Sequence, residues 1–169
     1  MSQWFRESFR KVHLLYVSPQ WAERRGEAFD AAAYAEAYAD AGVDCVQLYC
    51  KDHHGVCYFP SSLGLQYPRD ILGELLPELK KRNIKLMAYV SMFFDNYALG
   101  LHPEWRSVNE AGDPHKTGPF LHAAVSSPYS DFLLTQLEEI ASKYDVDGYW
   151  LDIIPLARNM PQELWMIQP

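Results

Sequence analysis

The sequence predicts an α/β protein with a parallel sheet, on the evidence of its apolar runs and of the segments that separate them. Each run is short and almost continuously apolar, as expected for a strand buried on both faces. The intervening segments are long enough for right-handed crossovers that carry helices. Four such units are half of an eight-stranded (β/α)8, or TIM, barrel, which typically takes about 250 residues. The four predicted strands are residues 12–17, 43–51, 85–91 and 148–154.

The first predicted helix begins after Asp30, a natural N-cap residue for the alanine-rich sequence that follows. Gly42 ends this helix in the usual C′ position. Tyr34, Tyr38 and Ala41 recur at helical spacing, so we expect them to pack on the sheet.

The second predicted helix begins near Asp70 and carries four leucines at the spacing of one helix face. These leucines are Leu72, Leu75, Leu76 and Leu79. Pro77 lies within the helix and cannot donate to the carbonyl four residues back. We therefore expect Pro77 to bend or shorten the helix.

A long segment without clear periodicity, residues 92–126, follows the third strand. Connections this long inside a compact domain are usually functional. Ser127 and Pro128 then open a helix. The apolar stripe of this helix comprises Leu133, Leu137, Ile140, Ala141 and Tyr144. The composition does not change along the chain, so residues 1–169 are expected to form a single domain.

Charge and cysteine content exclude several classes of protein. The net charge is -7 and the longest basic run is Lys80 to Arg82, which does not resemble a nucleic-acid footprint. The N-terminus is charged and has no apolar segment, so we expect a cytoplasmic protein without a membrane span. Cys45, Cys50 and Cys57 are an odd number in one segment, which predicts reduced thiols.

Asp152 is the best candidate for a functional residue because it follows the apolar residues of the fourth predicted strand. In a parallel sheet the loops after the strands meet at one edge, where α/β barrels keep their catalytic groups. We therefore expect His53, His54 and the 92–126 segment to lie near Asp152. The alternative is a carboxylate that caps a following turn, although burying a charge without a function is costly.

Several stretches resemble the α-L-fucosidase type of glycoside hydrolase. Residues 41–62 contain a strand that ends in a lysine before paired histidines and a glycine, with Pro-Ser downstream. Residues 83–91 resemble the following strand, and Y-D-V-D-G-Y-W-L-D at 144–152 resembles the strand that ends in the nucleophilic aspartate. H-P-E-W at 102–105 and S-P-Y-S-D at 127–131 are similar to segments of the fucosidase-like superfamily of glycosyl hydrolases.

The resemblance implies the N-terminal half of the catalytic barrel of a glycosidase that acts on O-glycosidic bonds, with a carbohydrate substrate and neither cofactor nor metal. Asp152 is implied as its nucleophile. A retaining glycosidase also needs a second carboxyl group about 5 to 5.5 Å away, which protonates the leaving oxygen. The residues expected to contact the sugar are Lys51, His53, His54, Tyr89, Trp105 and Trp150.

The chain departs from the family pattern in two ways. An acidic residue follows the histidines in the fucosidases, whereas here Asp52 precedes them and Gly55 follows. The general acid normally comes from the later half of the barrel, which this sequence does not contain. Glu104, Glu110 and Glu163 are available carboxyl groups, and each is better interpreted as a surface charge.

Three alternatives remain open from the sequence. The paired histidines are candidate metal ligands, but neighbouring side chains diverge on a strand and no H-x-H spacing occurs. Asp95 and Asn96 fit either the rim of a site or a turn. The whole chain fits either a glycosidase or a half-barrel that binds carbohydrate or assembles without catalysis. In both cases we expect a homo-oligomer that covers the open sheet edges.

Overall fold

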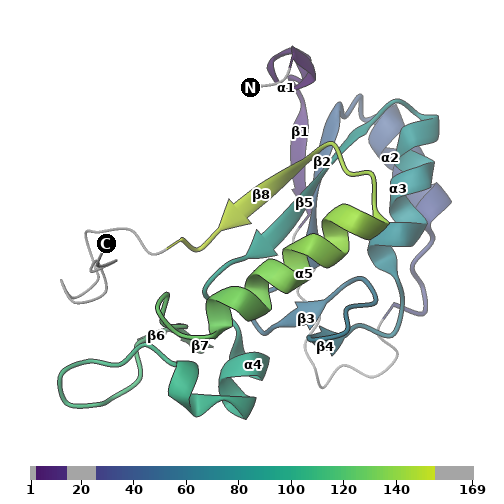
Figure 1. Ribbon diagram of the computed structural model, residues 1–169. Helices are drawn as coiled ribbons and strands as arrows, with labels where there is room; N and C mark the ends of the chain where they lie inside the picture. Colours follow the sequence, from purple (N-terminus) through teal and green to yellow (C-terminus); the bar gives the residue numbers. More distant parts are fainter. Residues whose placement is uncertain (1–2, 15–25, 155–169) are drawn as a thin grey trace.

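Four parallel strands form the centre of the computed structural model, which describes residues 3–14 and 26–154 (Figure 1). The strands are β1 (Lys11–Leu14), β2 (Cys45–Lys51), β5 (Lys85–Ser91) and β8 (Gly148–Asp152), and each pairs in parallel with the next. This confirms the predicted α/β class and parallel sheet. Residues 15–17 of the first predicted strand lie outside the described residues.

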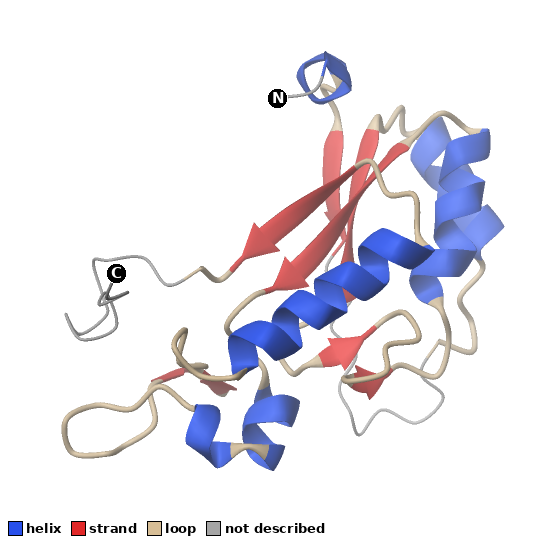
Figure 2. Ribbon diagram, viewed as in Figure 1, coloured by secondary structure: helices blue, strands red, loops and turns tan. Residues whose placement is uncertain are grey.

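Three helices pack along one side of the sheet: α2 (Ala31–Asp40), α3 (Ile71–Lys81) and α5 (Tyr129–Lys143) (Figure 2). Asp30 caps α2 as predicted, because its carboxylate accepts a hydrogen bond from the Ala33 N–H at 3.0 Å. Gly42 follows the helix with a φ of +64°. The buried residue of α2 is Ala35, and Tyr38 packs against the core as predicted, whereas Tyr34 and Ala41 are exposed.

Helix α3 is also capped as predicted, since the Asp70 carboxylate accepts from the Gly73 N–H at 2.7 Å. Pro77 lies within the helix, but α3 continues to Lys81, so the proline does not end it. Its predicted leucine face is fully internal. Burial of that face outweighs the single backbone hydrogen bond that Pro77 removes.

Short elements lie before β1 and in the loops that carry no periodicity in the sequence. They are α1 (Gln3–Glu7), β3 (Val56–Cys57), β4 (Leu65–Gln66), α4 (Asn96–Leu101), a 3-10 helix (Pro103–Trp105), β6 (Lys116–Thr117) and β7 (Phe120–Leu121). The 92–126 segment is thus a folded excursion in which β6 and β7 form a hairpin. It joins the carboxyl end of β5 to the start of α5 (Figure 1).

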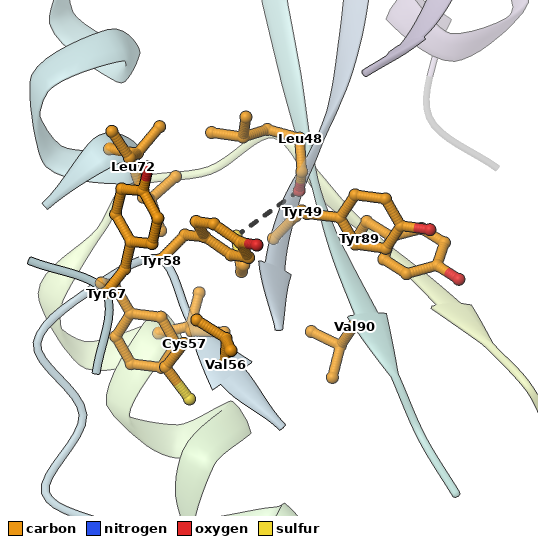
Figure 3. Close-up of a cluster of buried hydrophobic side chains, with 14 of the residues drawn as sticks. Leu48, Tyr49, Val56, Cys57, Tyr58, Tyr67, Leu72, Tyr89 and Val90 are labelled. Carbon is orange, nitrogen blue, oxygen red and sulfur yellow. Dashed lines mark hydrogen bonds between the residues drawn. The ribbon is translucent and has the colours of Figure 1, made fainter. Parts of the chain in front are cut away.

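The buried side chains of β2 and β5 belong to one hydrophobic core and project from both faces of the sheet (Figure 3). Leu48 lies with Tyr58 and Leu72 on one side of the strands. Tyr49 and Tyr89 lie together on the opposite face of the sheet, with ring centroids 4.1 Å apart. The three cysteines are free and buried, as predicted.

A buried ion pair connects the ends of β2 and β5 to the helices. Lys51 Nζ lies 3.0 Å from Asp95 Oδ2, and both side chains are only 1% exposed. The same ammonium group donates to the Ser91 carbonyl and to the Tyr129 hydroxyl, each at 2.8 Å. Asp95 in turn caps α4 by accepting from the Ala98 N–H at 2.8 Å. All these groups are satisfied, as buried charges require.

Gly55 makes room for this ion pair. Its φ is +85°, a conformation that residues with a Cβ rarely adopt, and a Cβ built there would lie 2.0 Å from Asp95 Oδ1. The close approach of the turn after β2 to the Asp95 carboxylate therefore requires a glycine at position 55.

Strand β8 is the last strand in the described sheet, and apolar side chains lie exposed beside it. A groove of about 310 Å³ is lined by Leu134, Leu137, Glu138, Ala141, Tyr149 and Leu151. An exposed strand edge invites pairing. The predicted covering of this edge by a second copy stays a prediction, as does the single-domain assignment. No helix in the described part of the chain is long and apolar enough to cross a membrane.

We predict that Lys51→Met destabilises the protein by about 3–5 kcal/mol, because it leaves the Asp95 carboxylate buried without its partner. Urea unfolding followed by circular dichroism measures the change. Lys80→Met is the matched control, since Lys80 pairs with an exposed Asp145. The two variants having the same unfolding midpoint would contradict this account of the buried pair.

Candidate active site

Asp152 lies at the carboxyl end of β8, beside the end of β5, where Ser91 is its register partner. The chain turns directly afterwards, because Ile153 has a φ of +58°. Asp152 Oδ2 accepts a hydrogen bond from the Tyr89 hydroxyl at 2.6 Å, and Oδ1 accepts from the Ile153 N–H at 2.8 Å. Both oxygens are therefore oriented, and the side chain is only partly buried.

Tyr89 projects from β5 and connects Asp152 to Tyr49, whose ring lies beside that of Tyr89. Burial raises the pKa of Tyr89, and its hydrogen bonds with Asp152 and Tyr49 raise it further. The phenol therefore stays protonated at physiological pH and donates to the carboxylate. His13 of β1 lies on the same face, with its ring centroid 5.1 Å from that of Tyr89.

His53 follows β2 and lies within reach of the same cluster. Its Nδ1 is 2.9 Å from Ser91 Oγ, and its ring packs edge-on against Phe120 and Phe94 at centroid distances of 5.0 and 5.5 Å. Burial lowers the pKa of His53; the negative charge of Asp152 opposes this shift, and the positive charge of Lys51 adds to it. The imidazole is therefore neutral at physiological pH.

His54 also packs against Phe120, with ring centroids 5.1 Å apart. Its Nδ1 is 3.4 Å from Asn96 Nδ2. The turn that presents both histidines is fixed by Asp52, which accepts from the backbone N–H groups of His54 and Val56 at 2.9 and 3.0 Å. Burial raises the pKa of Asp52, and these hydrogen bonds oppose the shift.

Two of the residues expected to contact the sugar make structural contacts. Lys51 is fully buried in its ion pair, and its place in a sugar subsite stays a prediction. Trp105 stacks on His102 with centroids 3.8 Å apart and packs against Phe132 of α5. These contacts assign Trp105 to the small core of the excursion, as expected for a loop that packs on its own side chains.

Trp150 lies two residues before Asp152 on β8, so both side chains project from the same face of the strand. It is the register partner of Tyr89 and is 41% exposed. An exposed indole beside a carboxylate is suited to stacking on the apolar face of a sugar ring.

The sequence did not single out several residues of the cluster. Tyr49, Ser91, Phe94 and Phe120 carry no motif and were missed. Ser91 had one available signal, its position as the last residue of the third strand. Of the two interpretations of Asp95, a site rim or a turn, the structure supports the turn, because Asp95 caps α4. Asn96 contacts His54. In residues 3–14 and 26–154, no group of three or more His, Cys, Asp and Glu side chains is placed to hold a metal ion.

The sequence profile of the family described as "Hypothetical glycosyl hydrolase 6" matches residues 30–153. The matched region includes β2, β5, β8 and all the cluster residues described above except His13. No match was found among curated protein sequences.

Three solved structures with a similar fold are α-fucosidases. Isoenzyme 2 from Paenibacillus thiaminolyticus superposes with a TM-score of 0.81 and 29% identity, over 88% of this chain and 24% of the fucosidase. The GH29 α-L-fucosidase from Bacteroides thetaiotaomicron gives 0.57 and 28%, over 73% and 27% of the two chains. The Thermotoga maritima α-fucosidase, solved with fucose, gives 0.58 and 19%, over 75% and 29%, and supports the fold alone. The chain thus spans about a quarter of the length of these fucosidases.

We predict that Asp152→Asn lowers the pKa of His53 further below its usual value of 6.5, because the substitution removes the negative charge that raises it. A histidine with a lowered folded-state pKa contributes stability above its unfolded pKa. That contribution is lost as the pH falls from about 6.5 through the folded-state pKa.

An NMR titration of the His53 ring measures this pKa. Tyr89→Phe is the control, since it removes the hydrogen bond to Asp152 and keeps the carboxylate charge. A His53 pKa that rises in Asp152→Asn, or that changes equally in both variants, would refute the assigned electrostatic coupling.

Proposed function

Because the chain belongs to the family described as "Hypothetical glycosyl hydrolase 6", we propose that it supplies the nucleophilic side of an α-L-fucosidase-like active site, with Asp152 as the nucleophile. The observation that carries the proposal is the carboxylate at the end of β8, oriented by Tyr89 and by the Ile153 N–H. A carboxylate that attacks an anomeric carbon must be ionised and fixed in direction. Hydrogen bonds from two donors favour both conditions.

The neighbouring side chains have complementary tasks in this proposal. Trp150 offers an apolar surface on the same face of β8 as Asp152. His53, His54 and Tyr89 offer polar atoms at the same sheet edge, which a sugar requires for its hydroxyl groups. Lys51 and Trp105 act indirectly, by supporting the loops that carry these groups.

The second carboxyl group of a glycosidase is not among the contacts of Asp152 in the described part of the chain. Glycoside hydrolysis needs a general acid that protonates the leaving oxygen. This observation keeps a second candidate function open: a half-barrel that binds carbohydrate without hydrolysing it. Binding with no turnover is the property that separates the two candidates.

We predict that Asp152→Ala lowers kcat for an aryl α-L-fucoside on the order of a thousandfold in the full-length gene product, because the nucleophile is lost. Asp145→Ala is the matched control: it removes an exposed carboxylate seven residues earlier, which pairs with Lys80 on the surface. The release of the aryl alcohol is followed by absorbance.

Added azide separates a nucleophile from a structural carboxylate. In Asp152→Ala, azide should restore release of the aryl alcohol and yield a fucosyl azide, because the small anion occupies the place of the missing carboxylate. Undiminished hydrolysis in Asp152→Ala would exclude Asp152 as the nucleophile. Binding of L-fucose without any hydrolysis, unchanged by the substitution, would favour the second candidate.

A further inference from the structure

The hydrogen-bond partners of the two histidine rings differ in a way that determines where each ring carries its proton. We infer that Ser91 and Asn96 hold His53 and His54 in opposite neutral tautomers, so that the pair offers one hydrogen-bond acceptor and one donor to a polyhydroxyl ligand. Ser91 and Asn96 are positioning residues in this inference, because they act through the histidines.

The argument for His53 rests on the single proton of the Ser91 hydroxyl. Ser91 Oγ lies 3.2 Å from the Phe94 carbonyl oxygen, which only accepts hydrogen bonds, so the hydroxyl proton is used there. Toward His53 Nδ1, 2.9 Å away, Ser91 Oγ can then only accept. Nδ1 therefore carries the ring proton, and Nε2 is left with a lone pair.

The argument for His54 rests on the orientation of the Asn96 amide. Its Oδ1 accepts from the Leu121 N–H at 2.9 Å, and its Nδ2 donates to the Pro119 carbonyl at 3.0 Å. These two backbone partners fix which end of the amide is oxygen. The Nδ2 group therefore faces His54 Nδ1 as a donor, at 3.4 Å, so Nδ1 accepts and the ring proton is on Nε2.

The two Nε2 atoms thus have opposite polarity. Neither Nε2 atom makes a hydrogen bond within the described part of the chain. The buried side-chain atoms that lack a partner there do not include either of them. A hydroxyl group that donates suits His53, and a hydroxyl oxygen that accepts suits His54. A carboxylate or phosphate ligand has only acceptors and would leave the His53 lone pair unmatched. That the ligand is a sugar rests on the proposed function, whereas the tautomers rest on the protein alone.

The surroundings keep the His53 ring neutral, which a tautomer requires. Burial lowers its pKa, and the positive charge of Lys51 beneath it acts in the same direction. The other titratable groups around the ring are Asp152 on β8, His13 on β1, the neighbouring His54, and the phenols of Tyr49 and Tyr89. Of these, Asp152 favours the protonated ring, so the neutral form prevails only while burial dominates.

The test is a nitrogen NMR measurement on the chain labelled with 15N-histidine, at a pH about one unit above the usual histidine pKa. The two signals are assigned with His53→Asn and His54→Asn. We expect an unprotonated Nε2 in His53 and an unprotonated Nδ1 in His54. The same tautomer in both rings would overturn the inference.

Two substitutions test the positioning residues. Ser91→Ala removes the acceptor for the Nδ1 proton and should shift the His53 tautomer ratio about five- to tenfold toward protonated Nε2, the effect of one lost hydrogen bond. Ser91→Thr keeps the hydroxyl and should retain the wild-type tautomer.

Asn96→Asp places a carboxylate oxygen near His54 Nδ1 and should reverse the His54 tautomer. Asn109→Asp makes the same change in an exposed loop and should leave both rings unaltered. Unchanged tautomers in Ser91→Ala and Asn96→Asp would contradict the inference.

A binding measurement separates this inference from the proposed function. L-fucose binding, measured by calorimetry, should weaken about five- to tenfold in Ser91→Ala and in Asn96→Asp, and recover in Ser91→Thr. The expected tautomers without L-fucose binding would reject the sugar as ligand and leave the tautomer assignment intact. Hydrolysis of the aryl fucoside by a wild type whose two histidines share one tautomer would reject the inference and leave the proposed function intact.

Discussion

The buried ion pair between Lys51 and Asp95 is the constraint on which the candidate site depends. It joins the end of β2 to the segment after β5, and the Tyr129 hydroxyl ties it to α5. The Phe94 carbonyl accepts from both Lys51 Nζ and the Ser91 hydroxyl, so the charge and the serine share an acceptor. Ser91, which accepts from His53, therefore belongs to the same hydrogen-bond network as the Lys51–Asp95 ion pair. Removing water from two charges costs several kcal/mol per ion, a cost that only a fully satisfied network can offset.

The larger elements could be predicted from the sequence because they bury long, regular apolar patterns. The β2, β5 and β8 strands and the helices α2, α3 and α5 all lie where periodicity and capping residues predicted them. The short elements of the excursion could not be predicted, because contacts with distant segments create them. Directly after the hairpin that carries Phe120, for example, His122 and Ala123 form backbone bridges to Phe94 and Arg106. Such tertiary contacts routinely override local propensity.

The candidate site was predictable where chemistry and position coincide. Asp152 and His53 come together because both follow parallel strands, and this edge rule needs no coordinates. The rule gives the place where a strand ends and not the face from which a side chain projects. Lys51, for example, follows a register irregularity in β2 and is buried in its ion pair. The sequence could not predict that Ser91 and Asn96 contact the histidines, because such contacts between individual side-chain atoms depend on the three-dimensional positions of distant residues.

Gly55 is a position at which a substitution would disturb the network around Lys51 and Asp95. Any residue other than glycine at this position brings a Cβ against the Asp95 carboxylate, so the cost of a substitution there is electrostatic as well as conformational. Here the glycine and the aspartate, 40 positions apart in the sequence, are coupled through space: a side chain at position 55 fits only if the Asp95 carboxylate moves away from its present position beside Lys51.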